Sequence, residues 1–135
     1  MIECLVLGDS IAVGTHMFAK QCQLVGQGGI NTWQFNKMYK NNLLAANAVI
    51  ISLGTNDHKG VNTRDELTKM RERVSSGNVY WIMPSIKPEI RAIVVEIALQ
   101  YGDQIISTQK LQADGIHPSW DGYKELVQHS VAIKG

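Results

Sequence analysis

The chain has 135 residues, 44% of them hydrophobic and 19% charged, which fits one ordinary globular domain over residues 1–135. Its 13 basic and 12 acidic residues leave a net charge of +1 without long runs of one sign, which argues against nucleic acid or an anionic membrane as the main partner. No apolar run is long enough to span a bilayer and no secretory signal is visible, so we expect no membrane span and a cytoplasmic or otherwise unassigned location.

Apolar runs of strand length alternate with segments of helical apolar spacing along the whole chain. In chain order they predict strand 2–7, helix 11–21, strand 22–25, helix 32–42, strand 48–53, helix 63–75, strand 78–83, helix 89–101, strand 104–107 and helix 119–132. The third strand, AVIISL, is apolar and mostly β-branched, so we expect it to be buried on both faces.

Residues at the ends of these segments suit helix starts and stops. Ser10 is predicted as the N-cap of the first helix. Either Asn62 or Thr63 can cap the third helix, because both side chains accept hydrogen bonds from a first turn. Pro88 suits the start of the fourth helix and Gly102 suits its end.

The alternation of strands and helices predicts an α/β fold, with a parallel sheet covered by helices on both faces. Right-handed crossovers make this a doubly wound, three-layer α/β/α sandwich. Five strands suit the flavodoxin-like order 2-1-3-4-5. In such sheets, ligands bind beyond the carboxyl ends of the strands, so the loops at that edge are where a site is expected.

Four polar clusters follow predicted strands at this edge: Gly8-Asp9-Ser10, Gly26-Gln27-Gly28-Gly29, Gly54-Thr55-Asn56-Asp57 and Asp114-Gly115-Ile116-His117. Each cluster alone could be an ordinary turn or helix cap held by its own hydrogen bonds. Because parallel strands end at one edge of a sheet, the four clusters are expected to meet. Their occurrence together predicts a functional site.

The residue types in these clusters suit acyl transfer, which needs a nucleophile, a base, a group that orients the base, and donors for an oxyanion. Ser10 is the candidate nucleophile, at a helix N-terminus that favours developing negative charge. His117 is the candidate base, and Asp114, three residues earlier, is close enough to orient its ring. The candidate oxyanion donors are the backbone N–H groups of Ser10 and Gly29 and the side-chain amide of Asn56.

These four clusters resemble the four sequence blocks of the SGNH hydrolases, the GDSL-type esterases and lipases. Gly8-Asp9-Ser10-Ile11 is similar to the first block, with Ile11 where the family often has leucine. Gly29 best matches the oxyanion glycine of the second block, although Gly28 is a credible rival. The resemblance implies a flavodoxin-like fold, a Ser-His-Asp mechanism without metal or cofactor, and esterase, thioesterase or deacetylase activity on a small-molecule or carbohydrate ester.

Two departures narrow this expectation. The chain is shorter than most members of the family, and the predicted loops are short, which favours an open site for a small acyl group such as acetyl. The nucleophile also differs from that of the α/β-hydrolases, which lies in Gly-x-Ser-x-Gly well inside the chain. Here Ala12 stands two residues after Ser10, near the N-terminus.

Four further residues could contact a substrate or form a disulfide. His58 and Trp120 are candidate substrate contacts, because each lies close in sequence to a predicted site residue. Cys4 and Cys22 lack the spacing of a zinc or redox site and are expected to be buried reduced thiols, with a disulfide as the alternative. No group of His, Cys and carboxylates has metal-ligand spacing.

Two other functions are compatible with the same fold. The chain could be a non-catalytic SGNH-fold module that binds a carbohydrate or a partner, although all the catalytic residue types are present. A flavodoxin-like nucleotide or flavin binder ranks lower, because the loop after the first strand lacks a phosphate-cradling run of Ser, Thr and Gly.

Overall fold

Five parallel β-strands form the central sheet of the structure, a computed structural model that describes residues 2–130. In chain order these strands are β1 (Cys4–Gly8), β2 (Gln23–Gly26), β4 (Ala48–Ser52), β6 (Asn78–Ile82) and β7 (Gln104–Ile106). They lie in the order β2-β1-β4-β6-β7, which is the predicted order 2-1-3-4-5 once the main-sheet strands are counted along the chain. The parallel sheet and its strand order are therefore confirmed.

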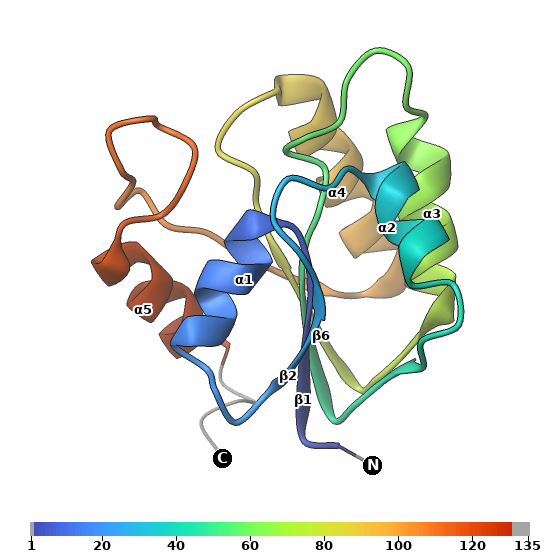
Figure 1. Ribbon diagram of the computed structural model, residues 1–135, viewed down its shortest axis with the longest axis horizontal. Coiled ribbons are helices and arrows are strands. Elements are labelled where there is room, and N and C mark those ends of the chain that lie inside the picture. The colour runs from blue at the N-terminus through green and yellow to red at the C-terminus, as the bar shows by residue number, and fades with distance from the viewer. Residues whose placement is uncertain (1, 131–135) are drawn as a thin grey trace.

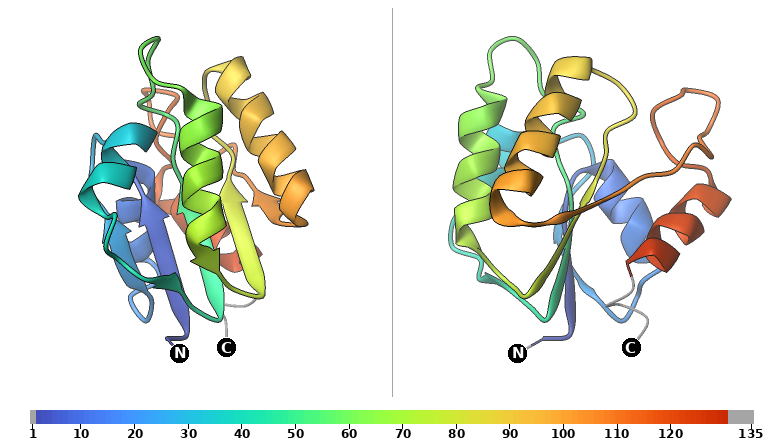
Figure 2. Two further views of the ribbon diagram at one scale, coloured as in Figure 1. Left: turned by 90° about the vertical axis from the view of Figure 1, so that its right-hand side faces the viewer. Right: turned by 180° about the vertical axis from the view of Figure 1, so that it is seen from behind.

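The helices cover both faces of the sheet, as predicted (Figures 1 and 2). Helices α1 (Ser10–Met17) and α5 (Trp120–His129) lie on one face. Helices α2 (Thr32–Met38), α3 (Thr63–Arg73) and α4 (Pro88–Tyr101) lie on the other. The sequence did not predict a separate two-stranded parallel sheet, β3 (Leu44–Ala45) and β5 (Val74–Ser75). Among residues 2–130, no helix has both the length and the hydropathy needed to cross a bilayer.

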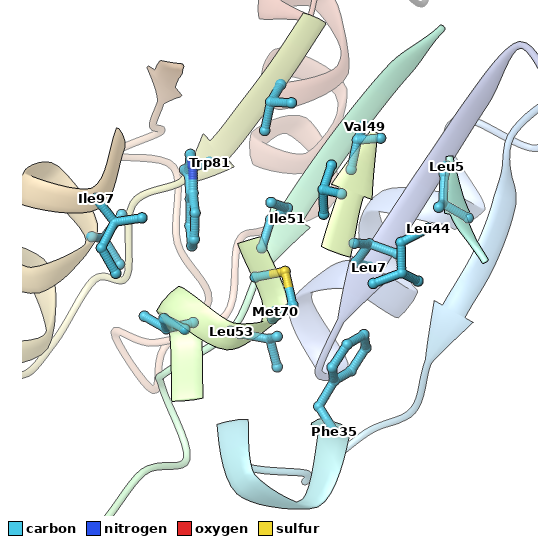
Figure 3. Packing of buried hydrophobic residues seen from close by; sticks show 14 of the residues in the cluster. Leu5, Leu7, Phe35, Leu44, Val49, Ile51, Leu53, Met70, Trp81 and Ile97 are labelled. Carbon is cyan, nitrogen blue, oxygen red and sulfur yellow. The ribbon is translucent and has the colours of Figure 1, made fainter. Parts of the chain in front are cut away.

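Two hydrophobic cores stabilise the three layers, because successive side chains of a strand point to opposite faces. Leu5 and Leu7 of β1 face α2, α3 and α4, whereas Val6 faces α1 and α5. Figure 3 shows the larger core, in which Ile51 of β4 packs near Met70 of α3. All five residues of β4 are buried, which confirms the expectation for the third predicted strand.

The helix ends differ from the predictions where two capping residues compete. Asp9, not Ser10, is the N-cap of α1, because its carboxylate accepts from the Ile11 N–H at 3.0 Å and Ser10 begins the helix. Asn62 is the N-cap of α3, and Pro88 and Gly102 lie at the start and the end of α4 as predicted. Helices α1, α2 and α3 end earlier than predicted, and the predicted end of the last helix at residue 132 lies outside the described residues.

Cys4 and Cys22 form a disulfide, so the expectation of two reduced thiols is wrong. The cause is the register of two neighbouring parallel strands. Leu5 of β1 pairs with Gln23 of β2, which brings the two preceding residues side by side with their Cα atoms 4.6 Å apart. The disulfide ties the edge strand β2 to β1, and β2 leads directly into the glycine-rich loop of the predicted site.

Candidate active site

The four polar clusters lie at the carboxyl edge of the sheet, each in the loop that follows a main-sheet strand. Close backbone contacts hold the first three loops together. A Cβ atom at Gly8 would lie 1.8 Å from the Ser52 carbonyl oxygen, and one at Gly26 would lie 2.1 Å from the Gly8 carbonyl oxygen. Both glycines also have positive φ angles, 136° and 159°. Glycine at these two positions therefore lets three neighbouring strand ends approach closely.

Ser10, His117 and Asp114 form a continuous chain of hydrogen bonds, although 107 residues separate the serine from the histidine. The Ser10 Oγ lies 2.8 Å from His117 Nε2, and His117 Nδ1 lies 2.7 Å from Asp114 Oδ2. A carboxylate can only accept, so His117 Nδ1 carries the proton and Nε2 is left to accept from the serine hydroxyl. This is the arrangement in which an imidazole can take the proton of a nucleophilic serine.

The Asp114 carboxylate is held as an anion by three donors. Its Oδ1 accepts from the backbone N–H groups of Ile116 at 2.9 Å and His117 at 3.0 Å, in addition to the His117 ring bond at Oδ2. These bonds, first that from Ile116, lower the pKa of Asp114 from 3.8 to about 2. The carboxylate therefore stays ionised at every pH at which an imidazole titrates, and can stabilise a positive charge on His117.

The loop that carries Asp114 and His117 spans residues 107–119 between β7 and α5, close to the interval that the predicted strand and helix leave between them. Its two sides are paired: the Gln112 N–H donates to the His117 carbonyl at 2.8 Å, and the Ser119 N–H donates to the Lys110 carbonyl at 2.8 Å. Figure 1 shows this loop in orange beyond α1 and α5. The pairing fixes His117 on a loop that has few buried residues of its own.

The Asn56 side chain is fixed between two of the loops. Its Nδ2 donates to the Ile30 carbonyl at 2.9 Å, just after the glycine-rich loop. The next residue, Asp57, is buried, and its carboxylate accepts from the Thr32 N–H and from the hydroxyls of Thr32 and Thr63 at 2.6–2.9 Å. The second amide hydrogen of Asn56 has no hydrogen-bond partner within residues 2–130, so it is free to donate to a bound ligand.

Gly28 and Gly29 both remain candidates for a backbone donor. A Cβ atom at Gly28 would lie 3.7 Å from the Cβ of Ser10, whereas nothing lies within 4 Å of the same position at Gly29. Gly29 has a φ angle of 79°, which favours glycine. In the described part of the chain, no hydrogen bond uses the backbone N–H of either residue. The structure thus places Gly28 nearer to Ser10 and leaves both N–H groups available.

Asp9 is buried directly before Ser10 and carries an incompletely bonded carboxyl group. Its Oδ1 accepts from the Ile11 N–H and from the Ser52 hydroxyl, both at 3.0 Å, while its buried Oδ2 has no partner among the described residues. Burial is the main cause that raises the pKa of Asp9 to about 6. Asp9 therefore titrates close to the range of an imidazole, which matters for any pH profile of the site.

The two candidate substrate contacts lie in different surroundings. His58 is exposed and lines a groove of about 950 Å³ that also contacts the start of α4. Trp120 is 72% exposed, and its ring packs edge-on against Phe18 with 6.3 Å between the centroids. Phe18 follows the last residue of α1, whereas Ser10 is the first, so the ring of Trp120 lies against the end of α1 that is distant from the nucleophile.

The groove brings together two loops whose relation the sequence did not show. Residues 57–64, after β4, form one side. Lys87, before α4, and Ile90 and Ile93 of α4 contribute to the other. Sequence reasoning missed these three residues because a lysine before a proline and an apolar helix stripe are ordinary features.

Within residues 2–130, no group of three or more His, Cys, Asp or Glu side chains is placed to hold a metal ion.

Comparison with known proteins supports the fold at low sequence identity. No family model and no curated protein matches the sequence. Among solved structures, a candidate acylhydrolase from Bacteroides fragilis aligns with a TM-score of 0.71 and 18% identity, over 97% of this chain and 86% of that protein. At such identity the likeness shows the shared fold.

Two further solved structures are similar to this chain. The C-terminal catalytic domain of peptidoglycan O-acetyltransferase A from Streptococcus pneumoniae, with a methylsulfonyl adduct, has a TM-score of 0.62 and 18% identity, over 95% of this chain and 91% of that one. An acetyl xylan esterase from the rumen bacterium Butyrivibrio proteoclasticus has a TM-score of 0.54 and 13% identity, over 93% of this chain and 61% of that one.

Proposed function

We propose that this protein is a serine esterase of the SGNH type that removes small acyl groups, above all acetyl, from carbohydrate or other small esters. The observation that carries the proposal is the chain of hydrogen bonds from Ser10 through His117 to Asp114, at 2.8 and 2.7 Å. These three residues lie at the carboxyl edge of the parallel sheet, where such folds bind their ligands.

In the proposed reaction, Ser10 Oγ attacks the carbonyl carbon of the ester while His117 Nε2 takes the hydroxyl proton. The negative charge on the carbonyl oxygen is stabilised by the backbone N–H group of Ser10, by that of Gly29 or its neighbour Gly28, and by the Asn56 amide. Collapse of the tetrahedral intermediate breaks the bond to the alcohol, which leaves with the proton from His117. A water molecule then repeats the sequence on the acyl-serine and releases the carboxylic acid.

Replacing Asn56 with alanine tests the side-chain oxyanion donor. We expect kcat for p-nitrophenyl acetate to fall roughly 10²–10³-fold, as when one preorganised donor is removed elsewhere, with a smaller change in KM. Steady-state kinetics measure both constants. Asn41, an exposed asparagine after α2, provides the control, because Asn41→Ala should keep wild-type kinetics. An unchanged kcat for Asn56→Ala would exclude this residue from the oxyanion site.

The preference for a small acyl group rests on the openness of the site and on the similar structures. The groove of about 950 Å³ begins at Asp57, the residue after Asn56, and we infer that the alcohol part of a substrate could extend into it. Two of the similar proteins are named for acetyl groups on peptidoglycan or xylan, both of which are carbohydrate polymers. The Cys4–Cys22 disulfide also suits an oxidising compartment outside the cytoplasm, where such polymers occur.

Comparing p-nitrophenyl acetate with p-nitrophenyl octanoate tests the acyl preference. We expect kcat/KM to be at least about tenfold higher for the acetate, because an open site gives a long acyl chain little apolar surface to bind. Release of acetate from acetylated xylan or peptidoglycan fragments, measured in parallel, tests the carbohydrate part of the proposal. Faster turnover of the octanoate would instead indicate an apolar acyl tunnel and a lipid-type substrate.

A further inference from the structure

Lys87 has an unusual backbone conformation at the start of α4. Its φ and ψ angles are 63° and 85°, and it is the sole non-glycine residue with positive φ in residues 2–130. Side chains with a Cβ atom disfavour this region, and a residue before a proline is normally extended. Glycine or asparagine would suit the position better, and the lysine does not cap the helix with its side chain. A strained residue of this kind often serves a neighbouring site.

The Lys87 side chain reaches across to the loop that carries Asn56. Its Nζ donates to the Thr55 carbonyl at 2.8 Å and to the Asp57 carbonyl at 2.5 Å. These carbonyls belong to the residues on either side of Asn56, so one ammonium group binds the backbone before and after the amide side chain. Lys87 is half-buried, and within the described residues no carboxylate lies at ion-pair distance from it. The Lys87 ammonium group therefore binds the backbone carbonyls of this loop rather than a carboxylate.

We propose that Lys87 is a positioning residue that holds Asn56 in the geometry needed to bind the oxyanion, an inference that rests on the proposed function. The other bonds of this loop, from Asn56 to Ile30 and from Asp57 to Thr32 and Thr63, act through side chains on the α2 and α3 side of the loop. Lys87, the residue before α4, instead holds the backbone carbonyls of Thr55 and Asp57. Oxyanion stabilisation depends on donors fixed in advance within fractions of an ångström, so loss of this bridge should slow the chemical step.

Lys87→Met removes the ammonium and keeps a chain of similar length. With p-nitrophenyl acetate we expect kcat to fall about 10- to 100-fold while KM stays within about twofold. Lys87→Arg can donate to the same two carbonyls and should restore part of the lost kcat. Lys40→Met, at an exposed lysine beyond α2, should behave as wild type. A wild-type kcat in Lys87→Met, or a loss that lies wholly in KM, would overturn the proposal.

A second pair of variants separates positioning from stability. Lys87→Ala and Lys87→Gly both lack the ammonium, but only glycine relieves the strained backbone, so Lys87→Gly should melt at the higher temperature. We expect the two variants to share the same low kcat. If kcat instead rises with melting temperature, Lys87 acts only on folding and the proposal fails. Ser10→Ala, assayed in the same series, tests the proposed function independently of the Lys87 variants. If Ser10 is the nucleophile, Ser10→Ala has no activity above the uncatalysed rate.

Discussion

Replacing Ser10 with alanine is expected to lower kcat for p-nitrophenyl acetate by about 10⁴-fold or more. The substitution removes the only atom that can form the acyl intermediate, and the His117 base then has no hydroxyl to deprotonate. The fold should survive, because the Ser10 side chain bonds only to His117 among the described residues and Asp9 caps the helix. Initial rates, corrected for the uncatalysed reaction, measure the loss.

Two observations make this result decisive. Ser75→Ala, at an exposed serine in the small β3–β5 sheet, should keep the full rate and so control for the serine-to-alanine change. A reactive organophosphate should label Ser10 in the wild type and leave Ser10→Ala unmodified, because only an activated hydroxyl reacts quickly. Equal rates for wild type and Ser10→Ala would mean that the activity is not Ser10 chemistry. A non-catalytic carbohydrate- or partner-binding module would then become the leading hypothesis.

The sequence signals of the candidate site are local, and the fold brings them to one edge of the sheet. Gly8, Gly26 and Gly54 end the apolar runs of the first three main-sheet strands, and parallel strands all stop at one edge. Each candidate residue therefore needs only its own short cluster to be recognised. The structure brings Ser10, His117 and Asp114 within hydrogen-bond distance and places Asn56 beside the glycine-rich loop. Their catalytic roles stay predictions until the variants are measured.

The features that the sequence did not show depend on register or on contacts between distant loops. The Cys4–Cys22 disulfide follows from the pairing of β1 with β2, which a count of cysteines cannot reveal. The sequence predicts Ser10 as the cap of α1, one residue late, because Asp9 and Ser10 are both good capping residues and stand side by side. The contact of Lys87 with the Asn56 loop spans 30 or more residues and leaves no pattern in the sequence.

The pH dependence of the wild-type enzyme separates the titrating groups of the site. Hydrogen bonds lower the pKa of Asp114 from 3.8 to about 2. The stabilisation that the Asp114 carboxylate gives to the folded state is therefore complete above about pH 4 and is lost only as the pH falls toward 2. A rise in kcat/KM between pH 5 and 9 must then come from another group, and an imidazole base predicts such a rise. Asp9, with its pKa raised to about 6, is the competing source. If the base is His117, Asp9→Asn should leave the midpoint of the rise unchanged.

Replacing Asp114 with asparagine is the second large effect, a fall in kcat of up to about 10⁴-fold. The amide oxygen can still accept from the backbone N–H groups of Ile116 and His117, so the loop should keep its shape. The amide NH₂ would then face His117 Nδ1 and favour the tautomer that carries its proton on Nε2. That tautomer cannot accept the Ser10 proton, and the neutral amide cannot stabilise an imidazolium.

The measurement compares kcat for Asp114→Asn with kcat for the control variant Asp121→Asn. Asp121 is an exposed aspartate in the first turn of α5, so this matched change should keep wild-type kinetics. A kcat within about tenfold of the wild type would mean that the loop alone orients His117. The functional unit would then be a Ser10–His117 pair, and the low pKa of Asp114 would reflect only its role in shaping the turn.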